Sequence, residues 1–176
     1  MLKNQQKTTG IVVNREVNVA KLIKPITNIM QESFEILPAD RIERVQVTRL
    51  LMEEKLAVED LPSSLSNFVV SGDNGEITGI AGFEVYSPYG LLRSVAVKPS
   101  HRNKNIAGAL VHSIEAAAKA KGLTEMYLLT ETASGYFAKK GYGAVSREEV
   151  PEAIKQSSEF SHVCPVSAVV MKKALL

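Results

Sequence analysis

The sequence has a single cysteine, Cys164, and no tryptophan. One cysteine excludes an intrachain disulfide and any metal site built from several thiolates. Aromatic residues make up 6% of the chain, and none of them mixes with basic residues in the way expected of proteins that stack the bases of single strands. The formal net charge of +2 is too small to indicate a strongly basic, nucleic-acid-binding face. We therefore expect no nucleic-acid partner.

Apolar runs long enough to cross a membrane are also missing. No stretch of roughly 18 apolar residues occurs, and residues 1–10 lack the apolar core of a secretory signal. These absences predict a cytoplasmic protein without a membrane partner. The 176 residues, 45% of them hydrophobic, can bury one sizeable core, so we expect a single domain.

The first 32 residues give no clear structural pattern. They combine a short β-like start with a later helical pattern that Pro25 interrupts. We therefore divide the chain into an unassigned N-terminal extension, residues 1–32, and a domain that covers residues 33–176.

Apolar patterns from residue 33 onward predict a mixed sheet flanked by helices. Asp40 is the expected cap of a first helix that ends near Leu56, and Asp73-Asn74-Gly75 is a strong hairpin signal between two strands. The predicted strands are residues 33–38, 66–72, 77–87, 91–97, 125–130 and 166–175, and the predicted later helices are 106–122, 133–142 and a short one from Pro151. This order of elements predicts an α/β (α+β) fold.

A basic loop precedes the longest predicted helix. Arg102 and Lys104 lie directly before Ile106, where the helix dipole disfavours positive charge. If an anion binds there, the unpaired N–H groups of the first turn and the cations converge on it, as in pyrophosphate sites. A solvated loop whose basic residues only aid solubility explains the same pattern.

Two segments resemble the GCN5-related N-acetyltransferase (GNAT) superfamily. Residues 91–111, LLRSVAVKPSHRNKNIAGALV, resemble motif A of that family, and residues 133–142 resemble its later helix. The resemblance implies a mostly antiparallel sheet splayed at the cofactor strand, with acetyl-CoA as co-substrate. It implies the following cofactor-binding residues: Val95, Ala96, Val97, Arg102, Asn103, Lys104, Asn105, Ile106, Ala107, Gly108 and Thr130.

Two positions depart from the family pattern. Asn105 stands where glycine is usual; asparagine is well suited to left-handed backbone, so the loop can form, but its side chain adds bulk beside the pyrophosphate. Phe137 stands at the position of the usual general-acid tyrosine. Tyr136 is therefore the candidate catalytic acid, and the alternative is that it only packs.

A narrower resemblance concerns the C-terminal part of the chain. Residues 91–97, 127–137 and 149–173 are similar to the subfamily of arsenic-resistance N-acetyltransferases. That name reflects operon context and does not identify an acceptor.

Glu84 and Arg93 are the remaining catalytic candidates. A hairpin closed by residues 87–90 would place them directly opposite each other on one face of the sheet. Glu84 could then act as base, and Arg93 could hold a substrate carboxylate or an oxyanion. The alternative is an ion pair that supports the hairpin.

Other polar residues have simpler explanations. Thr132 is expected to cap the helix that follows it, and Cys164 to pack rather than to act as a nucleophile. His101 and His112 have no partner at metal-ligand spacing, so no metal site is indicated.

The combined interpretation is an acetyl-CoA-dependent N-acetyltransferase. It would transfer the acetyl group directly to a small amine or an amino-acid-like acceptor. A non-catalytic acyl-CoA sensor and an interaction module are the alternatives. Exposed edge strands often pair across a dimer interface, which makes a homodimer an arrangement compatible with the sequence.

Overall fold

The computed structural model of the chain describes residues 34–73 and 75–175. The predicted N-terminal extension lies outside them. The strands are β1 (Glu35–Pro38), β2 (Phe68–Asp73), β3 (Glu76–Tyr86), β4 (Tyr89–Val97), β5 (Glu125–Thr130), β6 (Gly143–Val145) and β7 (Val169–Ala174), and the α-helices are α1 (Arg44–Glu53), α2 (Ile106–Ala120), α3 (Ser134–Ala138) and α4 (Glu152–Lys155). Among these residues, no helix combines the length and the apolar character that crossing a membrane requires.

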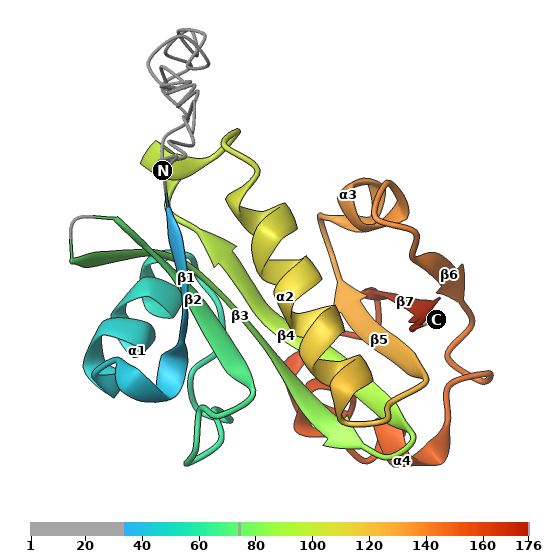
Figure 1. Cartoon of the computed structure of the whole chain (residues 1–176). Helices are drawn as coiled ribbons and strands as arrows, with labels where there is room; N and C mark the ends of the chain where they lie inside the picture. The colour runs from blue at the N-terminus through green and yellow to red at the C-terminus, as the bar shows by residue number, and fades with distance from the viewer. Residues whose placement is uncertain (1–33, 74, 176) are drawn as a thin grey trace, which may run out of the picture. The chain divides into compact units, whose positions relative to one another are not determined.

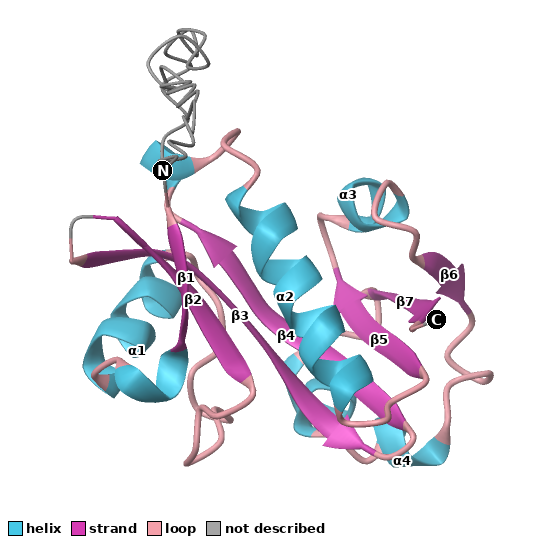
Figure 2. Ribbon diagram, in the orientation of Figure 1, coloured by secondary structure: helices cyan, strands magenta, loops and turns pink. Residues whose placement is uncertain are grey.

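A single sheet runs through the domain in the order β1-β2-β3-β4-β5-β7-β6 (Figure 2). Only the pair β4–β5 is parallel; every other neighbouring pair is antiparallel. The α/β fold with a mostly antiparallel mixed sheet is therefore confirmed.

The two long helices pack on opposite faces of this sheet. Side chains alternate between faces along a strand, and in β3 Ile80 joins the α1 cluster while Ala81 and Phe83 join the α2 cluster. The 15-residue helix α2 buries the stripe Ile106, Leu110, Val111, Ile114 and Ala118, and Figure 1 shows it lying along the sheet. The apolar period predicted this helix correctly.

The strand β4 is irregular at its centre. Its register against β3 shifts between the pairs Ile80↔Ala96 and Gly82↔Arg93, and Ser94, inside the break, has a positive φ of 55°. On its other side β4 pairs with β5 only over Tyr89–Leu91. The sheet therefore opens between the C-terminal ends of β4 and β5, which is the splay that the sequence predicts.

Local details differ from the sequence-based expectations. Asp40 does not cap the first helix: it lies in a 3₁₀ turn, Ala39–Arg41, and α1 starts at Arg44 after an N-cap residue, Glu43, whose side chain makes no cap bond. The chain is extended at Ile42, which separates the turn from the helix. The short strand β6 and a π-helical turn, Glu159–Val163, were not predicted.

The β3–β4 hairpin has a tighter turn than the sequence predicts. Tyr86 pairs with Tyr89, so only Ser87 and Pro88 form the turn. Glu84 consequently faces Leu91, and Arg93 faces Gly82. Glu84 and Arg93 remain diagonal neighbours on one face, because a shift by two residues preserves the side of the sheet.

Gly82→Ala tests the close packing at the centre of this face. A Cβ at position 82 would lie 2.2 Å from the ring of Phe68, so we expect a loss of about 2 kcal/mol in the free energy of unfolding. Gly135→Ala is the control, since no atom lies within 4 Å of its added Cβ. Urea unfolding measures both, and equal midpoints would contradict the predicted clash.

Candidate active site

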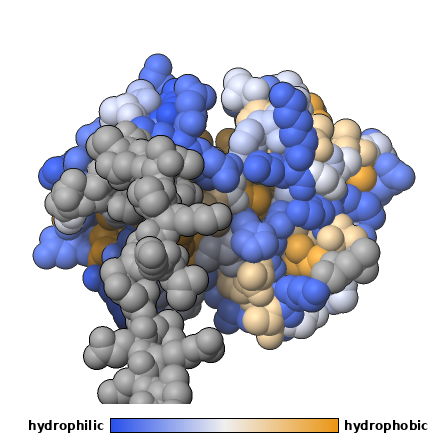
Figure 3. All heavy atoms as spheres, turned by 45° about the horizontal axis from the view of Figure 1, so that its top comes forward, coloured by the Kyte–Doolittle hydropathy of each residue, from blue (hydrophilic) through white to orange (hydrophobic). Residues whose placement is uncertain are grey.

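A cavity of about 360 Å³ opens where β4 and β5 separate. Figure 3 shows this end of the domain, where the surface is hollowed between two lobes with apolar residues at the bottom of the hollow. β4, the first turn of α2, the region around α3 and the end of α1 all contribute to the cavity. The lining residues are Glu54, Leu56, Val95, Ala96, Val97, Arg102, Ala107, Thr132, Ala133, Tyr136 and Phe137.

The first turn of α2 borders this cavity with unusual backbone geometry. Asn105 precedes the helix in the left-handed conformation, with φ 59° and ψ 15°, and makes no side-chain cap bond. Asn103 is left-handed as well, with φ 64°. The expectation that Asn105 can replace glycine here is confirmed. The first-turn N–H groups receive no side-chain cap and are suited to bind an anion.

The side chain of Asn105 packs against the helix that it precedes. A Cβ at Gly108 would lie 2.2 Å from Asn105 Oδ1. Glycine at position 108 therefore makes room for the amide of Asn105. The bulk of this side chain is accommodated beside the first turn of α2.

Arg102 joins the basic loop to the end of α1. Its Nε donates to the carbonyl oxygen of Val97 at 3.1 Å, and its Nη2 contacts Glu54 Oε2 at 2.5 Å. The side chain is 56% exposed, so the ion pair contributes little stability. Arg102 remains accessible to an anion that competes with Glu54.

Lys140 is a basic residue beside the first turn of α2 that the sequence analysis missed. Its Nζ lies 2.9 Å from the position of a Cβ on Gly108 and 5.6 Å from the centre of the Tyr136 ring. Within residues 34–73 and 75–175, no carboxylate forms an ion pair with it. Lys140 thus lies beside the positive end of α2 without an ion-pair partner among the described residues, a position that a bound anion would make favourable.

Tyr136 and Phe137 both line the cavity. Their rings meet edge to face with centroids 5.2 Å apart. The Tyr136 hydroxyl is buried and has no hydrogen-bond partner among the described residues. Burial, assisted by the charge of Glu115, raises the pKa of Tyr136. This phenol therefore keeps its proton at neutral pH, and no hydrogen bond to the described residues fixes its hydroxyl.

Thr130, the last residue of β5, and Thr132 differ in their contacts. Thr130 Oγ1 accepts the N–H of Ala133 at 3.0 Å, whereas Thr132 lines the cavity. The capping role expected for Thr132 is wrong, because α3 begins after Ala133 without a side-chain cap. Thr130 remains a proposed cofactor contact.

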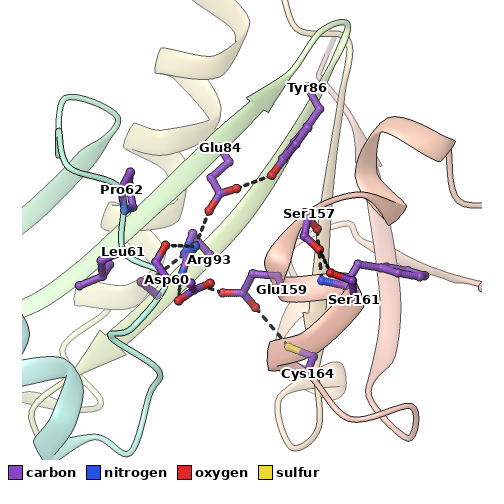
Figure 4. A network of polar contacts seen from close by, with 12 residues as sticks. Asp60, Leu61, Pro62, Glu84, Tyr86, Arg93, Ser157, Glu159, Ser161 and Cys164 are labelled. Carbon is purple, nitrogen blue, oxygen red and sulfur yellow. Dashed lines mark hydrogen bonds and ion pairs between the residues drawn. The ribbon is translucent and has the colours of Figure 1, made fainter.

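Arg93 lies at the centre of a buried polar cluster (Figure 4). We call Arg93, Asp60, Glu84 and Glu159 the Arg93 cluster. Arg93 is 3% exposed; its Nη1 contacts Glu84, and its Nη2 contacts Asp60 Oδ1 at 2.6 Å and Glu159 Oε1 at 3.3 Å. The expected pairing of Glu84 with Arg93 is present. The sequence analysis missed Asp60 and Glu159, which reach Arg93 from distant segments.

The other N–H groups of Arg93 are also used. Nε points to Ser94 Oγ and Nη1 to the carbonyl oxygen of Asp60, each at 3.4 Å. A guanidinium has five N–H donors; Arg93 forms four hydrogen bonds, and its contact with Glu159 is an ion pair. Most of its donors are therefore committed within the cluster.

Cys164 closes this cluster on one side. Its thiol donates to Glu159 Oε2 at 3.2 Å. Burial, followed by the contact with Glu159, raises the pKa of Cys164 to about 12. A thiol that stays protonated is a poor nucleophile, which favours the packing role expected for it.

Comparison with known proteins agrees with this geometry. The sequence model of the Acetyltransferase (GNAT) family matches residues 25–143. An uncharacterized N-acetyltransferase from Chlorobaculum tepidum is 32% identical over 101 residues, which are 57% of this chain and 64% of that protein. The amino-acid acetyltransferase of Escherichia coli K12 is 28% identical over 74% of this chain and 32% of its own length. The chain thus spans less than two thirds of these relatives.

Solved structures share the fold. N-acetylglutamate synthase from Neisseria gonorrhoeae, in complex with coenzyme A and N-acetyl-glutamate, superimposes with a TM-score of 0.70 at 18% identity, over 82% of this chain and 35% of that one. A Mycobacterium tuberculosis protein in complex with CoA gives a TM-score of 0.66 at 21% identity, over 81% of this chain and 99% of that one.

Lys140→Gln tests the anion site at the start of α2. If Lys140 contacts the pyrophosphate, its neutralisation removes one charge-assisted bond and should raise the dissociation constant of acetyl-CoA about tenfold. The exposed neighbour Lys139 provides the control, and Lys139→Gln should stay within about twofold. Titration calorimetry measures both variants. Equal effects would show that only general surface charge matters.

Proposed function

The chain belongs to the Acetyltransferase (GNAT) family, and on this premise we propose that it transfers the acetyl group of acetyl-CoA directly to the amino group of a small amine or an amino-acid-like acceptor. The observation that carries the proposal is the cavity at the β4–β5 splay, which adjoins the uncapped first turn of α2. The amino-acid acetyltransferases among the relatives support an acceptor of this class.

The residues around the cavity fit acetyl-CoA. We assign the pyrophosphate to the backbone of Arg102–Gly108 with Lys140, and the pantetheine arm to the backbone of Val95–Val97, which β5 does not pair. The pyrophosphate then supplies the negative charge that the basic side chains and the uncapped N–H groups at the start of α2 are suited to bind. When bound, acetyl-CoA supplies an activated thioester and a thiolate leaving group.

We assign proton donation to the thiolate to Tyr136. Tyr136 lines the cavity, its buried hydroxyl has no hydrogen-bond partner among the described residues, and a raised pKa keeps its proton in place at neutral and mildly alkaline pH. Phe137, at the usual tyrosine position, cannot supply that proton. Tyr136, which lines the same cavity, can supply the proton instead.

The Arg93 cluster favours the structural interpretation of Glu84 and Arg93. Arg93 forms four hydrogen bonds and an ion pair with Glu159, and Glu84 accepts from both Arg93 and the hydroxyl of Tyr86. These contacts are the ones expected of residues that hold neighbouring segments together. We therefore assign both residues a structural role on the acceptor side of the cavity. The suggestion that Arg93 binds the carboxylate of an acidic acceptor loses its main support.

The resemblance to arsenic-resistance N-acetyltransferases adds one class of acceptor to this proposal. Residues 149–173 carry that resemblance, and they contain the π-helical turn that brings Glu159 and Cys164 to the Arg93 cluster. An arsenical amino-acid analogue belongs beside ordinary amino acids and polyamines in an acceptor screen that follows thiol release. Acetyl-CoA binding without turnover of any amine would instead support the acyl-CoA sensor.

Tyr136→Phe tests the assigned proton donor. Loss of the hydroxyl should lower kcat about 100-fold, in the range of general acids, while the dissociation constant of acetyl-CoA stays unchanged. Because its raised pKa lies above the ordinary value of 10, wild-type activity should not fall on the alkaline side until above that value. Thiol release measured across pH checks both. A variant with wild-type kcat would reduce Tyr136 to a packing residue.

A further inference from the structure

The Arg102 side chain holds two acceptor groups at the cavity. Its Nη2 contacts Glu54 Oε2 at 2.5 Å, and its Nε donates to the carbonyl oxygen of Val97 at 3.1 Å. All three residues line the cavity at the β4–β5 splay. The guanidinium therefore joins the end of α1 to the end of β4 at the cavity to which we assign acetyl-CoA.

The Val97 carbonyl points toward the open side of β4. In a trans peptide unit the C=O and N–H bonds point in opposite directions. The N–H of the Val97–Lys98 unit belongs to Lys98 and donates to the carbonyl oxygen of Thr78 in β3 at 2.8 Å, so the Val97 oxygen points away from β3. On that side β5 pairs with β4 only over Tyr89–Leu91. Strand β5 therefore supplies no donor for this oxygen.

The Val97 oxygen needs a hydrogen-bond donor whether or not a ligand is bound. Val97 is 9% exposed, and a buried carbonyl without a donor is costly. In the structure Arg102 Nε is that donor. The pantetheine arm of acetyl-CoA carries amide N–H groups of its own, which can bind the same oxygen once Arg102 has left it. Arg102 and the ligand therefore compete for one acceptor.

Glu54 and the pyrophosphate compete in turn for the charge of Arg102. The Glu54 side chain is 11% exposed, and Arg102 is its only ion-pair partner in the part of the chain that the structure describes. Moving the guanidinium away leaves this carboxylate without its counter-ion at a cavity that receives a second anion, which is electrostatically unfavourable. The contact with Glu54 thus opposes the movement of Arg102 toward a phosphate.

We propose that Glu54 and Arg102 form a latch that closes the free end of β4 and that acetyl-CoA opens. The inference rests on the proposed function. On binding, the pyrophosphate takes the guanidinium from Glu54, and an amide N–H of the pantetheine arm replaces Arg102 Nε at the Val97 oxygen. Glu54 is a positioning residue that acts through Arg102, and it lowers the affinity of the chain for acetyl-CoA.

Glu54→Gln is the principal test, because glutamine keeps the shape of the side chain and removes its charge. Titration calorimetry with acetyl-CoA should give a dissociation constant about fivefold lower than that of the wild type, near the upper end for an ion pair with one exposed partner. Glu53→Gln is the matched control, since this neighbouring carboxylate is exposed and forms no ion pair among the described residues. It should stay within about 1.5-fold of the wild type.

A double-mutant cycle separates the latch from simple charge repulsion. Arg102→Gln removes the group through which Glu54 acts, so adding Glu54→Gln to it should leave the dissociation constant within about 1.5-fold of Arg102→Gln alone. An equal gain in affinity in both backgrounds would show that Glu54 repels the phosphate directly, and would overturn the latch. Weaker binding by Glu54→Gln than by the wild type would overturn it as well, because Glu54 would then hold Arg102 in place for the ligand.

Glu54→Asp guards against misfolding of the first variant, and urea unfolding shows whether each variant is folded. Aspartate keeps the charge on a side chain shorter by one methylene, so it should weaken the contact with Arg102 and lower the dissociation constant about twofold. Folded Glu54 variants that bind acetyl-CoA like the wild type would overturn the latch and leave the proposed function intact. No acetyl-CoA binding by the wild type or by any variant would overturn the proposed function itself.

Discussion

The break in strand pairing at Ser94 and Val95 is the constraint on which the rest of the site depends. A regular β4 would pair with β5 along its length and leave no cavity. The register shift against β3 and the short pairing with β5 instead free the backbone of Val95–Val97 and open the sheet beside the first turn of α2. The cavity and the unpaired stretch of β4 are thus consequences of one local irregularity.

Buried charge holds the other side of this opening in place. Arg93 joins β3, β4, the segment before β2 and the π-helical turn through its contacts with Glu84, Asp60 and Glu159. Removing one partner from such a cluster leaves a buried charge uncompensated, which is strongly destabilising. The cluster therefore fixes these segments relative to the irregular strand.

Regular patterns in the sequence predict the scaffold well and the site only in part. The apolar period of α2 and the basic loop before Asn105 identify the cofactor end, because both are local in the chain. Asp60 and Arg93 are 33 residues apart, and no periodicity relates them, so only the fold brings them together. Lys140 was missed for the same reason. The Glu84–Arg93 contact was found despite the wrong register, since an even shift keeps both side chains on one face.

Titration calorimetry of the wild-type chain with acetyl-CoA tests the central claim most directly. The account predicts one molecule bound per chain with a micromolar dissociation constant, because the cavity is bordered by the first turn of α2 and by the stretch of β4 that β5 does not pair, and Lys140 lies beside that turn. The absence of binding at millimolar acetyl-CoA would contradict it. The fold would then be that of an acetyltransferase, while the cavity at the splay would have another use.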